Sequence, residues 1–495
     1  MKKLIAIYCL LLFTSYTKAQ KVYEFNSTCQ HAYQEITKLK LNNGLALIEK
    51  EKKQNPNNLI PIILESYADF FELFFNEDAQ EYHLKKKKID ERIALLKSGP
   101  DSSPFYNFCL SAAYIHKAVI AIKFGETFTA GWDIKKAYQY IKQNKKDYPT
   151  FILNDILYGS MEAAIGTIPK GYKWLTDLLG MKGSVKEGMK LLENTVYSSD
   201  PFAKLMNNEA SFIYCFMNFH LENKKNETLQ FIKERKLDVV NNHLLAYMAA
   251  NLYKNNKQTS IAKSIIINRN KSPEYLQTEL WNYELGYCQI HHLEIKEAVV
   301  SFEHFTHHFK GNFYVKDVYQ KLSWCYYLLG NMEAAKIARN NVVQKGNTIT
   351  DADKQALKES RKNSWPNEQL LKIRMLNDGG YNNEALQLLL EKNVYTYTSL
   401  PEKLEYTYRL ARVDDDLGNY KDAIQNYLQT IQLGENRTEY FAARAAWQIG
   451  LIYEHEGNKQ QAINFYKKCL EMDDHDYKNS LDQKAKTGIA RCKGE

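Results

Sequence analysis

Apolar residues recur every three or four positions through most of the chain, with Gly, Asn or Pro residues between the apolar stretches. This period places apolar side chains on one face of an α-helix, and the strict alternation of a β-strand does not recur. In the N-terminal half we predict helical segments over residues 29–53, 59–75, 83–97, 105–124, 131–145 and 151–165. The pattern predicts an all-α protein.

Two segments near the C-terminus share one arrangement of turn, small and aromatic residues. In the first, Ala423 and Tyr427 follow Gly418-Asn419, and in the second, Ala462 and Tyr466 follow Gly457-Asn458. The arrangement resembles the tetratricopeptide repeat (TPR). In that repeat the small residues let two helices approach closely and the aromatic residue fills the next seam. The resemblance implies helix-turn-helix repeats stacked as an α-solenoid, a TPR-like superhelix.

The same template predicts three more units upstream. The second-helix Ala residues of all five units are Ala298, Ala335, Ala385, Ala423 and Ala462. Two positions depart from the template, because Leu293 stands where a turn Gly is expected and Arg339 stands where an aromatic residue is usual. The long spacing after Ala335 predicts an inserted helix that begins at the capping pattern of residues 350–353. The amphipathic residues 480–491 are predicted to form a C-terminal capping helix.

The first residues predict a secretory signal peptide. Met1-Lys2-Lys3 precede an apolar stretch over residues 4–13, and Thr17-Lys18-Ala19 supply a small-residue cleavage site. We therefore divide the chain into a signal peptide at 1–19, a degenerate helical-repeat (TPR-like) region at 20–270, and TPR repeats with a capping helix at 271–495. The mature protein is expected to be exported to the periplasm or the extracellular space, without an integral membrane span.

The degenerate region contains one block with a resemblance of its own. Ile168-Pro169, Trp174-Leu175, Gly183, Gly188 and Leu191-Leu192 follow one another there. The block resembles the helical-repeat region of the eukaryotic inclusion-body-clearance TPR proteins, over about residues 109–193. The resemblance implies a shared architecture and transfers no functional residue.

Charge argues against nucleic acid as a partner. Cleavage after Ala19 removes three Lys residues, so the formal net charge falls from +8 to +5. The run Lys85–Lys88 is followed by Asp90-Glu91-Arg92, which is typical of a solvated helix face of mixed charge. A nucleic-acid-binding protein would need a sustained basic stripe.

The sequence offers little support for catalysis. Seven Cys residues remain after cleavage, with no C-x-x-C pair, and we expect them to be buried and reduced. Gly183–Gly188 is spaced like a phosphate loop, but Met189 and Lys190 replace its required Lys and Ser/Thr, which favours a helix–helix turn. No H-E-x-x-H or G-x-S-x-G motif occurs. We predict a protein that is not an enzyme and has no cofactor.

One histidine cluster leaves a metal-binding alternative open. The cluster is His291, His292, His304, His307 and His308. His304 and His308 are four residues apart and would share a helix face, which could chelate a transition metal. We favour the interpretation that they form the exposed end of a second helix. Metal analysis of the purified protein would separate the two.

The first helices of such repeats line a concave groove, and the groove offsets can be transferred unit by unit. Aromatic and Arg residues at these offsets are typical of binding hot spots, although each of them could equally fill an inter-helix seam. The transferred groove positions are Tyr283, Tyr287, Trp324, Tyr327, Arg374, Tyr408, Arg412, Trp447 and Glu454. The family's chaperone-tail type would have Lys and Asn at these offsets, so a chaperone-tail receptor is not expected.

These features predict an exported, non-enzymatic TPR scaffold that binds a protein or peptide in its concave groove. The alternative is an adaptor subunit of a cell-envelope or outer-membrane assembly, whose N-terminal half docks to a membrane protein. The minor alternative is a metal-binding protein that uses the histidine cluster.

Overall fold

The computed structural model describes residues 20–167, 181 and 183–494, and their regular secondary structure is helical. Within these ranges the β-type pairing consists of one isolated parallel bridge between Val22 and Asn58. The predicted fold class, all-α with helix-turn-helix repeats stacked as an α-solenoid, is confirmed. The predicted signal peptide at 1–19 and the Ile168-Pro169 to Trp174-Leu175 part of the inclusion-body-clearance block lie outside the described residues.

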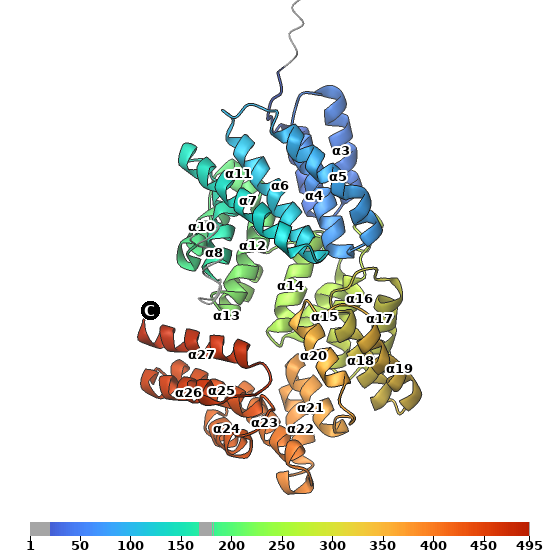
Figure 1. Cartoon of the computed structure of the whole chain (residues 1–495), viewed down its shortest axis with the longest axis vertical. Coiled ribbons are helices and arrows are strands. Elements are labelled where there is room, and N and C mark those ends of the chain that lie inside the picture. Colours follow the sequence, from blue (N-terminus) through green and yellow to red (C-terminus); the bar gives the residue numbers. More distant parts are fainter. Residues whose placement is uncertain (1–19, 168–180, 182, 495) are drawn as a thin grey trace, which may run out of the picture. The chain divides into compact units, whose positions relative to one another are not determined.

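The described helices of the N-terminal half are shown in Figure 1. They are α2 (Ser27–Thr37), α3 (Leu41–Gln54), α4 (Ile60–Asn76), α5 (Ala79–Leu96), α6 (Pro104–Lys123), α7 (Thr127–Asp147), α8 (Asn154–Gly166), α10 (Val185–Val196), α11 (Pro201–Leu205), α12 (Asn207–His220), α13 (Lys225–Glu234), α14 (His243–Asn255) and α15 (Thr259–Asn268).

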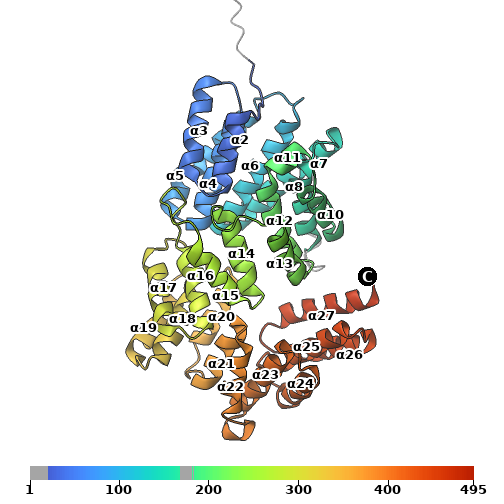
Figure 2. The ribbon, with the colours of Figure 1, turned by 180° about the vertical axis from the view of Figure 1, so that it is seen from behind.

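The helices of the C-terminal half form successive pairs, with α20, η2 and α27 outside the pairs (Figures 1 and 2). They are α16 (Leu280–His291), α17 (Ile295–His308), α18 (Val315–Leu328), α19 (Met332–Gln344), α20 (Asp351–Ser360), α21 (Glu368–Gly379), α22 (Asn382–Leu390), the short 3-10 helix η2 (Val394–Thr396), α23 (Leu400–Asp416), α24 (Tyr420–Gly434), α25 (Phe441–His455), α26 (Lys459–Glu471) and α27 (Lys478–Lys493).

The chain forms two compact units. Of the described residues, unit 1 contains those within 20–252, 264–281 and 305–315, and unit 2 contains those within 253–263, 282–304 and 316–494. Each unit therefore draws on segments from both halves of the sequence. The division at residue 270 that the sequence suggests stays a prediction.

Helix α6 lies in the core of unit 1. It packs against α4 and α7, and Leu110, Ala118 and Ile120 on it are buried. Of the helices in the described ranges, it alone has the length and apolar composition that could cross a membrane, and 61% of its most apolar window is buried inside the structure. Such burial is what a core helix of a helical protein requires.

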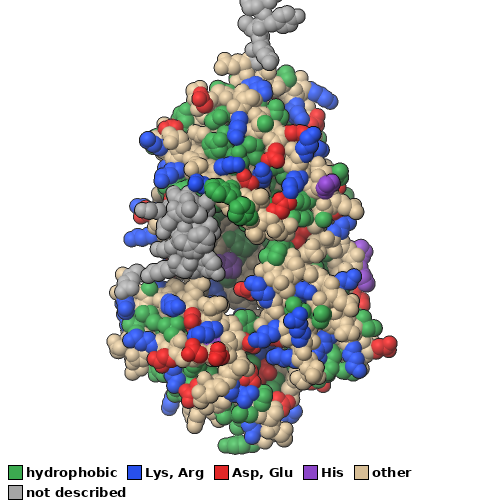
Figure 3. All heavy atoms as spheres, viewed as in Figure 1, with side chains coloured by type: hydrophobic (Ala, Val, Ile, Leu, Met, Phe, Trp, Pro, Cys, Tyr) green, Lys and Arg blue, Asp and Glu red, His purple; other side chains and the backbone are tan. Residues whose placement is uncertain are grey.

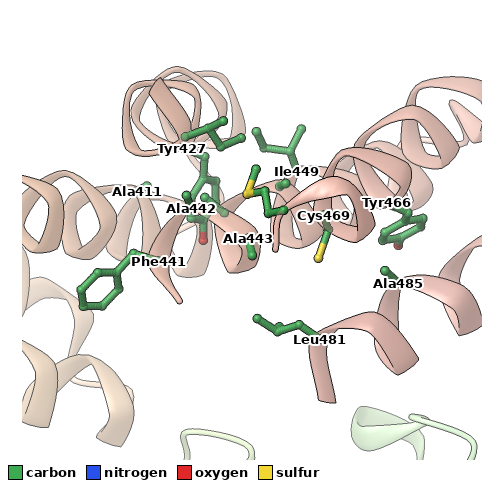
Figure 4. Packing of buried hydrophobic residues seen from close by; sticks show 14 of the residues in the cluster. Ala411, Tyr427, Phe441, Ala442, Ala443, Ile449, Tyr466, Cys469, Leu481 and Ala485 are labelled. Atoms are coloured by element: carbon green, nitrogen blue, oxygen red, sulfur yellow. The ribbon is translucent and has the colours of Figure 1, made fainter. Parts of the chain in front are cut away.

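In unit 2, helices α23 to α27 form antiparallel neighbours that stack side by side (Figures 1 and 2). The pairs α23/α24 and α25/α26 are joined by contacts between α24 and α25, and α27 closes the stack on α26. The predicted small residues Ala423 and Ala462 and the aromatic residues Tyr427 and Tyr466 are completely buried in one cluster. Figure 4 shows Tyr427 and Tyr466 within it. The predicted capping helix is confirmed as α27.

Tyr466 shows why the template needs small residues. A Cβ atom placed on Gly450 of α25 would lie 2.5 Å from its ring, and one placed on Gly488 of α27 would also lie 2.5 Å away. The ring therefore fits between two helices only where neither has a side chain. Gly286 makes the same approach to Phe302 in the unit formed by α16 and α17.

The turns between paired helices use one left-handed residue each. Gly330, Gly380, Gly418 and Gly457 have φ values between +75° and +86°. Leu293, at the position where the template expects Gly, has φ +59°. The turn register predicted from the sequence is confirmed, and at Leu293 a residue with a Cβ adopts the conformation that Gly adopts without steric cost.

The inserted helix predicted after Ala335 is α20. Thr350 is its N-cap and its side chain accepts a hydrogen bond from the Asp353 backbone N–H at 3.0 Å, as the capping pattern predicts. Asp353 is completely buried and accepts a further hydrogen bond from the backbone N–H of Asp317 on α18. This contact fastens the inserted helix to the repeat before it.

The seven described Cys residues are buried, and none of them forms a disulfide. Burial raises the pKa of Cys288 and Cys325 to about 12, so both thiols are protonated at neutral pH. They act as small apolar side chains in the repeat cores, as the sequence indicates.

Candidate functional site

Unit 2 contains a cleft of about 510 Å³. Its walls come from the first helices α18, α21 and α23, from the N-terminal end of α25, and from the inserted α20 with the loop at residues 361–367. Its apolar lining residues are Trp324, Trp365, Leu371, Tyr440 and Phe441. Its charged lining residues are Arg339, Lys362, Arg374, Arg409, Glu359, Glu402, Glu405, Glu439 and Asp476. Aromatic surface and charges of both signs are therefore available to one occupant.

Trp324 is held in place by two cations. The Nζ atom of Lys321 lies 4.4 Å from its ring centroid, and the guanidinium carbon of Arg374 lies 5.0 Å away. Both are within the range of a cation–π interaction. Trp324 is 7% exposed, so its contact with an occupant is confined to the edge that the cleft leaves open. Trp324 and Arg374 were both predicted as groove residues, and both line the cleft.

Trp365 is one of several lining residues that sequence reasoning missed, with Arg409, Tyr440 and Phe441. The ring of Tyr327, a predicted groove residue, stacks on the Trp365 ring with the two centroids 5.1 Å apart. The guanidinium carbon of Arg339, a residue of α19, lies 4.6 Å from the centroid of the Trp365 ring. Arg339 also donates hydrogen bonds to the backbone carbonyls of Ser360, Lys362 and Ser364, which fixes the loop. Arg339 is half-buried, and these loop carbonyls supply acceptors for its guanidinium. The repeat template has no position that would predict Trp365.

Two arginines that line the cleft, Arg374 and Arg409, form ion pairs with carboxylates of their own helices. Arg409 donates to Glu405 at 2.8 Å on α23, and Arg374 lies 3.7 Å from Asp378 on α21. Burial disfavours ionisation of Asp378, but Arg374, Arg412 and Arg409 more than offset it and hold the pKa of its carboxyl well below the usual range. The Asp378 carboxyl is therefore ionised at neutral pH, and both carboxylates are already paired with arginines.

Tyr283 and Tyr287 are two further predicted groove residues, and both lie on α16. Tyr283 is buried and Tyr287 is half-buried, and the Lys254 ammonium lies 5.1 Å and 4.7 Å from their rings. The Tyr287 hydroxyl donates to Asp317. Neither tyrosine lines the cleft. Lys321 connects Tyr287 to it, because its Nζ atom lies 5.7 Å from the Tyr287 ring centroid and 4.4 Å from that of Trp324.

The remaining predicted groove residues lie on α23 and α25. Tyr408 is completely buried in the repeat core and Arg412 is 8% exposed, whereas Trp447 is half-buried. Glu454 accepts two hydrogen bonds of 2.8 Å from Arg491 of α27. The structure brings Trp324 and Arg374 together in the cleft and places these four outside its lining.

The phosphate-loop-like segment forms a helix contact. Ser184 is the N-cap of α10, and its hydroxyl accepts from the Glu187 backbone N–H. A Cβ on Gly188 would lie 2.4 Å from the Gly159 carbonyl oxygen and 2.5 Å from the Ala163 backbone nitrogen on α8. These glycines let α8 and α10 approach closely, in agreement with the helix–helix interpretation.

The histidine cluster has one half-buried member, His291, and four exposed members. His304, His307 and His308 are exposed on the last turns of α17, as the favoured interpretation predicts. Burial lowers the pKa of His291 on α16 to about 4, so it is neutral at pH 7. His292 is exposed and lies 3.1 Å from Glu294. The metal-binding alternative stays a prediction.

Surface charges of both signs alternate on the face shown in Figure 3. Lys and Arg side chains are interspersed there with Asp and Glu side chains, without a continuous stripe of one sign. The Lys85–Lys88 run follows the same rule, because Lys85 pairs with Asp69, Lys86 with Glu126, and Lys87 with Glu91. This is the mixed-charge helix face that the sequence indicates.

Comparisons with known proteins bear on the repeats. A family model for the tetratricopeptide repeat matches residues 403–474. No curated protein matches the chain. Among solved structures, a human IFIT1 dimer with m7Gppp-AAAA is 13% identical over 91% of this chain and 90% of that one, with a TM-score of 0.35.

Two further solved structures have similar coverage. The TPR domain of P58(IPK) is 12% identical over 87% of this chain and 97% of that one, with a TM-score of 0.23. A chain of the APC/C hetero-tetramer Cut9–Hcn1 is 12% identical over 93% of this chain and 95% of that one, with a TM-score of 0.26. Because these TM-scores are below 0.5, neither the helix arrangement of those proteins nor their bound partners is transferred to this chain.

Proposed function

Because the chain is a tetratricopeptide repeat protein, with residues 403–474 matching the repeat, we propose that it is an exported, non-enzymatic scaffold that holds a protein or peptide in the cleft of unit 2. Repeat stacks present first-helix side chains on an extended surface suited to binding. The observation that carries the proposal is the lining of the cleft by aromatic side chains fixed by neighbouring cations.

The chemistry of the cleft supports a polypeptide as its occupant. Trp324, Trp365 and Phe441 offer apolar area for side chains, and the charged residues around them can satisfy backbone and side-chain polar groups. Aromatic and Arg residues dominate binding hot spots in protein interfaces. A cleft of about 510 Å³ accommodates a few residues of a peptide or one anchoring loop of a protein.

Affinity capture from the native source, with variants of the cleft, tests the proposal. The cleft variants are Trp324→Ala and Trp365→Ala. The matched control is Tyr395→Ala, which removes an aromatic side chain that is 87% exposed in unit 2 and does not line the cleft. Circular dichroism and thermal unfolding must show that each variant is folded.

The expected result is a partner that wild type and Tyr395→Ala both retain and that the two cleft variants lose. Truncation of a hot-spot aromatic residue weakens binding by about 2 kcal/mol or more, or roughly thirtyfold. Retention of the partner by all four proteins would show that the cleft is not the binding site.

A further inference from the structure

Helix α7 of unit 1 has a stripe of accessible side chains on the face opposite its core contact. Its core face, which includes Ala137 and Ile141, is buried, and α7 packs against α6. Residues of the stripe follow one another at alternating spacings of four and three positions, which keeps their side chains on one face of a helix. The members are Phe128, Trp132, Lys135, Gln139, Lys142 and Lys146, of which Lys135 is half-buried and the others are exposed.

Two aromatic side chains begin the stripe. Phe128 is 81% exposed and Trp132 is 47% exposed. The backbone around them is open as well, because a Cβ atom added to Gly125 or to Gly131 would meet no neighbouring heavy atom within 4 Å in the described part of the chain. Phe128 and Trp132 therefore project from an open surface, and their apolar area is in contact with water.

The rest of the stripe is positively charged. Lys135, Lys142 and Lys146 form no ion pair with a carboxylate among the described residues. The two other lysines of α7, Lys136 and Lys145, lie beside the stripe, and each of them pairs with a carboxylate. The stripe therefore presents its ammonium groups to the same side as the two aromatic rings.

The carboxylates near the stripe leave this charge in excess. Glu126, the N-cap of α7, pairs with Lys86 of α5. Asp133 is 4% exposed and lies 3.6 Å from Lys117. Asp147, the last residue of α7, is exposed to one side of the stripe and accepts a hydrogen bond from Gln143. Three ammonium groups thus face one carboxylate, and that carboxylate is at the end of the helix.

We propose that this stripe of α7 docks the protein on the surface of an anionic phospholipid membrane. Phe128 and Trp132 enter the interface between headgroups and acyl chains, where aromatic side chains are favoured. The lysines that follow them contact the phosphate groups of the anionic lipids. The contact is peripheral, and it concerns a second surface that does not depend on what the cleft of unit 2 holds.

The shape of the stripe favours a lipid surface over a protein partner. Aromatic hot spots in protein interfaces lie in packed pockets whose surroundings exclude water. Phe128 and Trp132 instead stand on an open helix surface without neighbouring atoms at Gly125 and Gly131 in the described part of the chain. A fluid bilayer requires no matching wall, because lipid molecules rearrange around an inserted side chain.

Co-sedimentation with vesicles tests the proposal. The protein is the chain from residue 20 to 495, so that the apolar residues 4–13 do not contribute. One set of vesicles contains equal parts of phosphatidylglycerol and phosphatidylcholine, and the other contains phosphatidylcholine alone. The aromatic variant is Phe128→Ser with Trp132→Ser, and the lysine variant is Lys142→Gln with Lys146→Gln.

Each variant has a matched control elsewhere on the surface. Tyr395→Ser removes an aromatic side chain that is 87% exposed in unit 2. Lys50→Gln with Lys53→Gln removes two exposed lysines from α3 of unit 1, and so makes the same change in charge as the lysine variant. All the substituted residues are exposed, and circular dichroism confirms that the variants are folded.

Wild type and both controls are expected to sediment with the anionic vesicles and much less with phosphatidylcholine alone. The aromatic variant should bind the anionic vesicles roughly tenfold more weakly, because it loses two apolar side chains from the interface. The lysine variant should also bind roughly tenfold more weakly, since each lysine near an anionic surface contributes to attraction. Added salt should weaken the binding of wild type.

Tryptophan fluorescence identifies the residue that enters the bilayer. Vesicles whose phosphatidylcholine carries brominated acyl chains should quench part of the fluorescence of wild type. Trp132→Phe should still sediment with the vesicles, because it keeps an aromatic ring at this position, but the quenching should be lost.

Four results would overturn the proposal. They are equal sedimentation of wild type with both kinds of vesicle, sedimentation of the aromatic variant equal to that of wild type, sedimentation of the lysine variant equal to that of wild type, and quenching that Trp132→Phe retains. If wild type does not bind vesicles and the aromatic variant loses a protein captured from the native source, the stripe belongs to a protein interface instead.

Discussion

Glu209 places a carboxyl group in the core of unit 1. Its two oxygens accept hydrogen bonds from Tyr33 on α2 at 2.5 Å and from Tyr67 on α4 at 3.1 Å. Burial raises the pKa of Glu209, and the two tyrosine hydroxyls only partly offset this effect. The group therefore joins three helices of unit 1 and takes up a proton more readily in the folded state than in the unfolded state.

Glu209 should give unit 1 a pH-dependent stability. Above the pKa of an unfolded glutamate, about 4.3, the folded state holds more protons at this site than the unfolded state. The contribution of Glu209 to the free energy of unfolding therefore falls as the pH rises from about 4.3 toward neutrality. Urea unfolding of wild type and Glu209→Gln at several pH values measures it, because Gln does not titrate. A difference that is independent of pH between about 5 and 7 would contradict the raised pKa.

The same substitution should have opposite effects at two glycines. Gly418 has φ +81° in a turn of unit 2, with open space where a Cβ atom would lie, so Gly418→Ala should cost roughly 1–2 kcal/mol through backbone conformation alone. Gly131 lies inside α7 with equally open space, so Gly131→Ala should stabilise its helix by about 0.5–1 kcal/mol. Urea unfolding of both variants checks the signs. Equal effects at the two positions would contradict the assigned turn conformation.

At the scale of the element, neighbouring helices of the repeats pack closely because an aromatic side chain of one helix fits against a glycine of the next. Tyr466 of α26 fits between Gly450 of α25 and Gly488 of α27, and its hydroxyl donates to Glu454 at 2.5 Å. A side chain on either glycine would force the ring or a helix to move. A close helix–helix contact of this kind therefore requires a large aromatic side chain on one helix and a glycine on its neighbour.

Gly450→Ala should destabilise the protein by about 1–3 kcal/mol, because the added methyl group overlaps the Tyr466 ring. Tyr466→Leu in the same chain should recover part of that cost, because the smaller side chain leaves room for the methyl group. Thermal unfolding of the two single variants and the double variant gives the coupling between the positions. Strict additivity would show that the two side chains do not meet.

The helix pairs were predictable from sequence where residue type alone sets the conformation. The Gly turns and the Thr350 cap are such cases, since a left-handed turn and an N-cap each select a few residue types. The segment 29–53 was predicted as one helix but is divided into α2 and α3, because Leu39 has φ +66°. The left-handed conformation of a Leu cannot be predicted from the sequence, because tertiary contacts impose this conformation.

At the scale of the whole molecule, the repeats supply most of the lining of the cleft and the irregular parts complete it. Trp324 and Arg374 could be predicted because they occupy template positions on first helices. Trp365 could not, because it lies in a loop after α20 for which the template has no position. Tyr408 occupies a template groove position and is nevertheless completely buried, since Phe441 of the next first helix covers its ring.

Export is a separate prediction for the chain as a whole. When the chain is expressed with residues 1–19 in a secretion-competent host, we expect cleavage after Ala19 and a mature N-terminus at Gln20. Intact-mass measurement of the protein from the exported fraction checks this. An Ala19→Arg variant should be processed poorly, because the cleavage site requires a small residue. An exported protein of full-length mass would contradict the assignment.

Hydrogen–deuterium exchange of the chain, alone and with its captured partner, tests the central claim most directly. If the partner occupies the cleft of unit 2, its binding should slow exchange in the loop at 361–367 and along α21 and the first half of α23. Exchange in α6 and α7 of unit 1 should stay unchanged. Protection confined to unit 1, with the cleft residues exchanging as in the free chain, would contradict the account.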